Sequence, residues 1–138
     1  MGTSPQIPKK VFVIEDEQYL RDLYVQLLTQ EGYEVSQAAD GEEALKKIYA
    51  EEYDLILLDI ILPKVDGLHI LENVSLTKKT LLKRVVLLTN LSQEIVMAQA
   101  LQYGVRGYMV KSDLTPLQVL NEVKNYITQI EASARTQP

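Results

Sequence analysis

Acids, a threonine and a lysine stand at the ends of the apolar runs of this chain. Glu15 and Asp16 follow the run VFVI, and Asp59 closes the run LILLD. Thr89 closes VVLLT, and Lys111 follows GYMV. Because a carboxylate in apolar surroundings is costly unless it is paired or reaches water, Asp59 is either a cap at a strand end or a reactive group presented there.

These residue types suit the binding of a metal ion and a phosphoryl group. Three carboxylates in one cleft repel, each pair by roughly 4 kcal/mol at ~4 Å and an effective dielectric of 20. Mg²⁺ prefers oxygen ligands and is usually held by one or two carboxylates plus a phosphate. We therefore expect Glu15, Asp16 and Asp59 to share Mg²⁺. Asp59 is the candidate nucleophile, with Thr89 and Lys111 neutralising the phosphoryl oxygens.

Two hydrophobic periods alternate along the chain and predict five strands, each followed by a helix. The strands are expected at residues 11–14, 33–38, 55–58, 85–88 and 107–110. The fourth helix is expected at 92–102, with Ser92 as its cap. The fifth is expected to start after Thr115, with Pro116 at its first position and Gln118 completing a capping box. After Ile130 no periodicity remains, and fraying is expected.

This alternation predicts an α/β fold, a parallel five-stranded sheet covered by helices on both faces. Among the few allowed topologies, the order 2-1-3-4-5 puts the first and third strands side by side at a switch point. Glu15, Asp16 and Asp59 would then converge. We expect one domain at 10–131, with flexible segments at 1–9 and 132–138.

Composition excludes several classes of protein. With 138 residues, 46% hydrophobic and 24% charged, the chain fits a single folded domain. The absence of cysteine excludes disulfides and thiolate metal sites, and fits a reducing compartment such as the cytoplasm. No apolar run approaches the roughly 20 residues of a membrane span. A net charge of −5 without a basic stripe argues against direct nucleic-acid binding.

The motifs VIEDE, LILLDIILPKVDG, VVLLTN and GYMVK, in this order and spacing, resemble the receiver domain of two-component response regulators over roughly residues 10–130. The resemblance implies a doubly wound (βα)5 flavodoxin-like domain. It also implies that Asp59 is the phosphoacceptor and that Glu15 and Asp16 form the acidic pair. Asp16 would then bind Mg²⁺ directly, and the main-chain carbonyl of Ile61 would be another ligand.

The same resemblance implies a signalling switch rather than a conventional enzyme. Thr89 and Lys111 match the residues that hold the phosphoryl oxygens, and Tyr108 matches the aromatic residue that moves with Thr89. The donor would be a histidine kinase or a phosphotransfer protein. We expect phosphorylation to shift the face formed by residues 92–130, where a second copy or a downstream protein would bind.

The sequence departs from the common family pattern at several positions. Glu15 replaces an aspartate and would reach the metal through water, and Asn90 stands where a small alanine is usual. Ser112 replaces a proline that is typically cis in the family, which leaves the isomer of the Lys111–Ser112 bond open. Ile61 and Leu91 flank the site and cannot orient water, so we expect slow autodephosphorylation.

Other functions on the same architecture fit less well. A flavodoxin-like redox protein needs a phosphate-cradling loop after the first strand, where this chain has Glu-Asp-Glu. An NAD-binding domain needs a glycine-rich turn there. A phosphoaspartyl phosphatase would have a second aspartate at position 61. The remaining rival is a degenerate receiver that acts only as an interaction module.

Overall fold

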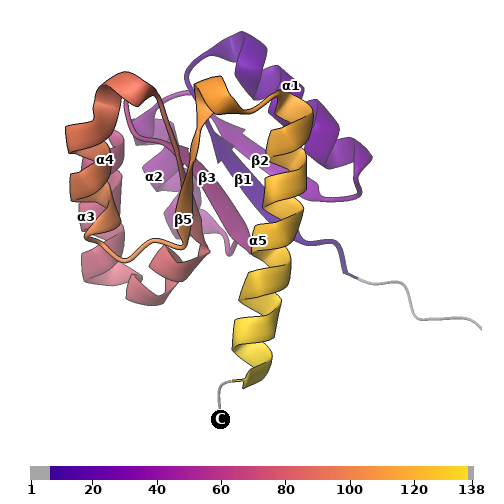
Figure 1. The fold of residues 1–138 in the computed structure, drawn as a ribbon. Coiled ribbons are helices and arrows are strands. Elements are labelled where there is room, and N and C mark those ends of the chain that lie inside the picture. Colours follow the sequence, from indigo (N-terminus) through magenta and orange to yellow (C-terminus); the bar gives the residue numbers. More distant parts are fainter. Residues whose placement is uncertain (1–6, 137–138) are drawn as a thin grey trace, which may run out of the picture.

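Two runs of leucine, isoleucine and valine form the middle strands of a five-stranded sheet in the computed structural model, which describes residues 7–136 (Figure 1). The strands are β1 (Lys10–Ile14), β2 (Glu34–Ala38), β3 (Leu55–Asp59), β4 (Val85–Thr89) and β5 (Gly107–Val110). All pairings are parallel, and the order is β2-β1-β3-β4-β5. The predicted fold class and strand order are therefore confirmed. Every residue of β3 and β4 is buried, as expected of strands covered on both faces.

Helices cover both faces of this sheet. They are α1 (Gln18–Gln30), α2 (Gly41–Ala50), α3 (Gly67–Thr77), α4 (Glu94–Leu101) and α5 (Pro116–Thr136). Figure 1 shows α1 and α5 on one side of the sheet and α2, α3 and α4 on the other. Short 3₁₀ helices lie at Lys79–Arg84, Leu91–Gln93 and Lys111–Asp113.

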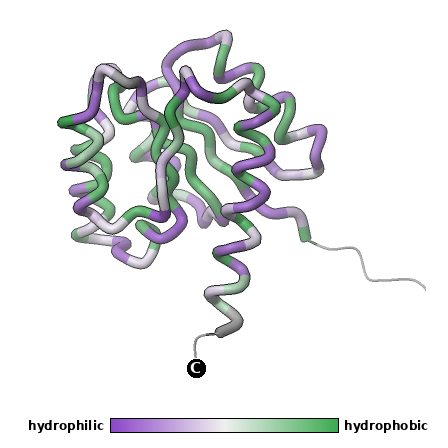
Figure 2. The backbone as a smooth tube through the Cα atoms, viewed as in Figure 1, coloured by the Kyte–Doolittle hydropathy of each residue, from purple (hydrophilic) through white to green (hydrophobic). Residues whose placement is uncertain are grey.

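Alternate residues of each strand fill one of two apolar cores, because successive side chains point to opposite faces of a sheet. Val11 and Val13 pack with the buried stripes of α1 and α5. Phe12 and Ile14 pack with α2, α3 and α4, where the Phe12 ring stacks on Tyr53 at 4.7 Å between centroids. Figure 2 shows the hydrophobic strands gathered in the interior. The packed sheet thus fixes the positions of the residues that follow its strands at the carboxyl edge.

The helix starts confirm one predicted cap and correct another. At α5 the Gln118 amide N–H donates to Thr115 Oγ1 (3.2 Å), and the Thr115 N–H donates to Gln118 Oε1 (2.8 Å), as predicted. The prediction of Ser92 as the cap before α4 was wrong. Ser92 lies inside the 3₁₀ turn, and the chain enters it from Asn90, whose N–H donates to Gln93 Oε1 at 3.2 Å. The Asn-x-x-Gln spacing was the signal for this start.

The last helix is longer than expected. It continues to Thr136, whereas the sequence predicted fraying after Ile130. The segment EASART contains no glycine or proline, so nothing in it stops a helix. Residues 1–6 and 137–138, which belong to the segments predicted to be flexible, lie outside the described residues, and the domain limits of 10 and 131 stay a prediction. Between residues 7 and 136, no helix is long and apolar enough to cross a membrane.

The loop after β3 is held firmly against its neighbours. The Gly41 N–H donates to the Pro63 carbonyl at 3.2 Å, and the Gly67 N–H donates to the Ile60 carbonyl at 2.7 Å. A Cβ on Gly41 would overlap the main-chain oxygen of Val65, so only glycine permits this approach. The loop that follows the candidate nucleophile is therefore fixed at both ends.

Candidate functional site

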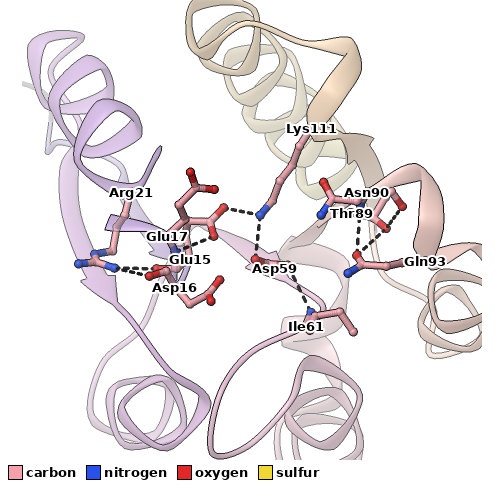
Figure 3. Close-up of polar contacts among 10 residues, drawn as sticks. All are labelled: Glu15, Asp16, Glu17, Arg21, Asp59, Ile61, Thr89, Asn90, Gln93 and Lys111. Carbon is pink, nitrogen blue, oxygen red and sulfur yellow. Dashed lines mark hydrogen bonds and ion pairs between the residues drawn. The ribbon is translucent and has the colours of Figure 1, made fainter. Parts of the chain in front are cut away.

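The strand order brings the three predicted acids to one edge of the sheet (Figure 3). Ile14 pairs with Leu58 in the β1–β3 register, so the next residues, Glu15 and Asp59, end up adjacent. Glu15 is 0% exposed and Asp59 is 4% exposed, whereas Asp16 is exposed to solvent. One carboxylate oxygen from each of these residues lies within 4.8 Å of the others. The predicted convergence of the acids is present in the structure.

Lys111 bridges the two buried acids from the end of β5. Its Nζ lies 2.6 Å from Glu15 Oε1 and donates a 2.8 Å hydrogen bond to Asp59 Oδ2. The contact with Glu15 is an ion pair without hydrogen-bond geometry, which leaves the buried Oε1 without a hydrogen-bond partner in the described residues. No cis peptide bond occurs between residues 7 and 136, so the Lys111–Ser112 bond is trans.

One lysine does not neutralise these acids fully. Burial raises the pKa of Glu15 to about 7, although its contact with Lys111 acts in the opposite direction. Burial also raises the pKa of Asp59, again against the effect of Lys111. Burial by itself would lower the pKa of Lys111, but its bonds to the two acids outweigh burial and raise it. The site therefore favours any further positive charge.

These residues fit Mg²⁺. The donors are carboxylate oxygens, which this hard cation prefers, and Glu15 Oε1 is a buried acceptor with no hydrogen bond to lose. The raised pKa of Glu15 shows that its negative charge is undercompensated, so a cation nearby would be stabilised. An exposed Asp16 beside the buried pair leaves the cluster open to solvent on one side.

The turn after β3 holds the Asp59 carboxylate in place. The Ile61 N–H donates to Asp59 Oδ1 at 3.3 Å, and the Ile60 N–H extends the sheet by donating to the Leu88 carbonyl at 3.3 Å. The Ile61 side chain is 44% exposed and apolar beside this carboxylate. The role of the Ile61 carbonyl as a ligand stays a prediction. The side chain of Leu91, also expected at the site, lies outside the described part of the chain.

Thr89 is buried at the end of β4, on the strand next to Asp59. Its hydroxyl donates to the Asn90 carbonyl at 3.2 Å and, at 3.5 Å, approaches Gln93 Oε1 at the start of the segment leading into α4 (Figure 3). Tyr108, the expected partner of Thr89 in switching, is 46% exposed on β5. Thr89 thus makes its hydrogen bonds on the side of α4.

Two further polar side chains at this edge carried no functional prediction. Gln93 contacts Thr89 and closes the turn from Asn90, and its capping-box spacing was the available signal. Arg21 on α1 donates from Nη1 to the Glu15 carbonyl at 2.9 Å. A single arginine among the polar residues of a helix gives no such signal, because its reach back to the loop depends on the folded geometry.

Comparison with known proteins places this geometry in a family. The sequence profile of the response regulator receiver domain matches residues 11–123. The alkaline phosphatase synthesis transcriptional regulatory protein PhoP of Bacillus subtilis is 36% identical over 126 residues, which cover 91% of this chain and 51% of that protein. The transcriptional regulatory protein ResD of Bacillus subtilis is 33% identical over 115 residues, 83% of this chain and 46% of that protein. The chain thus spans about half the length of these relatives.

Solved structures agree with this assignment. A CheY-like response regulator receiver domain protein from Methanospirillum hungatei superposes with a TM-score of 0.81 and 28% identity, covering 92% of this chain and 99% of that one. The chemotaxis response regulator CheY4 of Vibrio cholerae gives 0.77 and 26%, covering 87% and 99%. Both similarities extend over nearly the whole of each chain.

Proposed function

This chain belongs to the response regulator receiver domain family of two-component signalling, and on that premise we propose that Asp59 is its phosphoryl acceptor. The observation that carries the proposal is the bridge made by Lys111 Nζ, which lies 2.6 Å from Glu15 and 2.8 Å from Asp59. A histidine kinase or a phosphotransfer protein would supply the phosphoryl group from a phosphohistidine. We place this transfer of the phosphoryl group in the cytoplasm.

The transfer forms one bond and breaks another. An oxygen of the Asp59 carboxylate attacks phosphorus, the P–O bond forms as the P–N bond breaks, and the bonding electrons stay on the donor histidine nitrogen. The Ile61 N–H holds the other carboxylate oxygen, Oδ1, so that the attacking oxygen keeps its orientation. Lys111 then gives up its bond to Asp59 Oδ2 and binds the oxygens of the incoming phosphoryl group.

The three acids would together hold the metal ion. The proposed ligands are Glu15, Asp16, Asp59 and the main-chain carbonyl of Ile61, and Glu15 would reach the ion through water. Bound Mg²⁺ supplies positive charge to the oxygens of the transferred group. This chain accelerates its own phosphorylation and dephosphorylation in this way, without acting on a separate substrate as a conventional enzyme does.

The signal leaves the site through Thr89. Its hydroxyl now bonds to the Asn90 carbonyl on the side of α4, and it would turn toward a phosphoryl group on Asp59. Tyr108, which is half exposed, would move inward as Thr89 withdraws. Phosphorylation would thereby shift the conformational equilibrium of the face formed by residues 92–130. This face would bind a second copy or a downstream protein.

Intact-mass spectrometry after treatment with acetyl phosphate and Mg²⁺ tests the acceptor. We expect one added phosphoryl group on the wild type and none on Asp59→Asn. Asp54→Asn is the matched control, because Asp54 precedes the same strand at its opposite end, where it accepts from the Lys10 N–H at 2.7 Å. This variant should be labelled like the wild type. A labelled Asp59→Asn protein would refute the assignment.

The rival function, a module that only binds partners, predicts no labelling of the wild type by acetyl phosphate or by a phosphohistidine donor. Beryllofluoride, which mimics a phosphoryl group on aspartate, tests the switch separately. We expect it to change the self-association or partner binding of the wild type but not of Thr89→Ala. Unchanged binding in the wild type would reject the switch while leaving phosphorylation intact.

A further inference from the structure

Arg21 clamps the main chain of the acidic loop between β1 and α1. Its Nη1 donates to the Glu15 carbonyl at 2.9 Å and lies 3.4 Å from the Asp16 carbonyl (Figure 3). We propose that Arg21 is a positioning residue for Mg²⁺: its guanidinium fixes the loop so that the carboxylates of Glu15 and Asp16 stay in place to hold the ion. The inference rests on the proposed function.

The other bonds of the loop show why this clamp matters. The Glu15 N–H donates to the Ala38 carbonyl at 3.1 Å, and the Glu15 side chain accepts from the Glu17 N–H at 3.1 Å. Glu15 is thus fixed through its amide and its side chain. Within residues 7–136 the exposed Asp16 carboxylate takes part in no hydrogen bond or ion pair of its own. Its position therefore depends on the main chain, and Arg21 binds that main chain.

Arg21 is itself held in position by two elements. Its Cα belongs to α1, and its Nε donates to Gln37 Oε1 on β2 at 3.2 Å. The planar guanidinium can bond the amide oxygen of Gln37 on one side and the loop carbonyls on the other. A lysine has the same charge but a single nitrogen, and cannot reproduce this fork. The loop is in this way tied to both α1 and β2.

Outer residues that orient metal ligands typically change metal affinity by about 10-fold to 100-fold when they are mutated. We therefore expect Arg21→Ala to raise the Kd for Mg²⁺ about 10-fold or more, measured on the whole chain by isothermal titration calorimetry. Arg21→Lys should also weaken binding, because charge without the fork does not hold the carbonyls.

Arg84 provides the matched control. Its Nη1 donates to the Tyr53 carbonyl at 3.0 Å, just before β3, so Arg84→Ala removes the same kind of bond at the opposite edge of the sheet. This variant should bind Mg²⁺ like the wild type. Urea unfolding of each variant shows which of them are folded, and Arg21→Lys decides the question if Arg21→Ala does not fold.

Three results would overturn the inference while leaving the proposed function standing. These are wild-type affinity in Arg21→Ala, full recovery of affinity in Arg21→Lys, and equal weakening in Arg84→Ala. Recovery by lysine would mean that charge alone acts, and equal weakening would mean a general loosening of the fold. If the wild type itself does not bind Mg²⁺, the proposed function fails, and the role of Arg21 fails with it.

Discussion

In the absence of metal, the buried Glu15 should make the folding stability depend on pH. The substitution Glu15→Gln should remove most of this dependence. Burial raises the pKa of Glu15 from 4.5 to about 7 in the folded protein. The folded state therefore binds this proton more tightly than the unfolded state does. The stability gained is fully present below pH 4.5, the value of the unfolded chain, and is lost as the pH rises through about 7.

The magnitude follows from the same pKa values. A tenfold change in proton affinity corresponds to 1.36 kcal/mol, so the whole difference is about 3 kcal/mol. Integration over the measurable range assigns about 2 kcal/mol of it to the interval between pH 5 and pH 7.5. The raised pKa of Asp59 adds a contribution of the same sign. In Glu15→Gln, Lys111 pairs with Asp59 alone, which reduces the contribution of Asp59 as well.

Urea unfolding followed by circular dichroism, in buffer with EDTA, measures the effect at pH 5, 6 and 7.5. We expect the wild type to be more stable at pH 5 than at pH 7.5 by about 2 kcal/mol, and Glu15→Gln to show less than half of this rise. Glu31→Gln is the control, because Glu31 pairs with Lys124 at 2.8 Å on the surface. Parallel curves for the wild type and Glu15→Gln, or a wild type that loses stability toward pH 5, would refute the reasoning.

Four further substitutions test other parts of the structure. Thr115→Ala should lower the free energy of unfolding by about 1 kcal/mol, whereas Ser92→Ala, which removes no cap, should leave the urea midpoint unchanged. Gly41→Ala should lower the free energy of unfolding by more than about 2 kcal/mol, because its Cβ would overlap the main-chain oxygen of Val65. Wild-type stability in this variant would show that the loop can move aside. Phosphorylated wild type should keep its label beyond seconds in Mg²⁺, and Ile61→Asn should lose it about 10-fold faster by intact mass, since an amide can orient water. Equal rates would contradict the last of these.

The fold could be predicted largely because the strands are so apolar. The continuous runs LILLD and VVLLT are too short for helices and are typical of strands buried on both faces, which occur in parallel sheets covered by helices. Once the sheet is parallel, the residues that follow its strands must share one edge, which brings Glu15, Asp59 and Lys111 together. This step needs only topology and no knowledge of side-chain conformation.

Features that depend on competition between local signals could not be predicted in the same way. Ser92 and Asn90 are both good caps by residue type. Asn90 is the residue preceding the turn because it follows β4 directly and keeps an extended conformation, with φ −106° and ψ 156°. The contacts of Arg21 and Gln93 likewise depend on where a helix sits against a loop, which no spacing in the sequence encodes.

The geometry of Thr89 explains how a charge at the sheet edge can reach α4. A hydroxyl has a single hydrogen to donate, and in this structure Thr89 gives it to the Asn90 carbonyl at 3.2 Å. The same hydrogen cannot also bind a phosphoryl oxygen on Asp59. On the proposed function, a phosphoryl group on Asp59 would compete with the Asn90 carbonyl for this hydrogen. Asn90 is also the residue from which the chain enters the turn held by Gln93. We propose that this exchange of one hydrogen bond couples the site to the segment leading into α4.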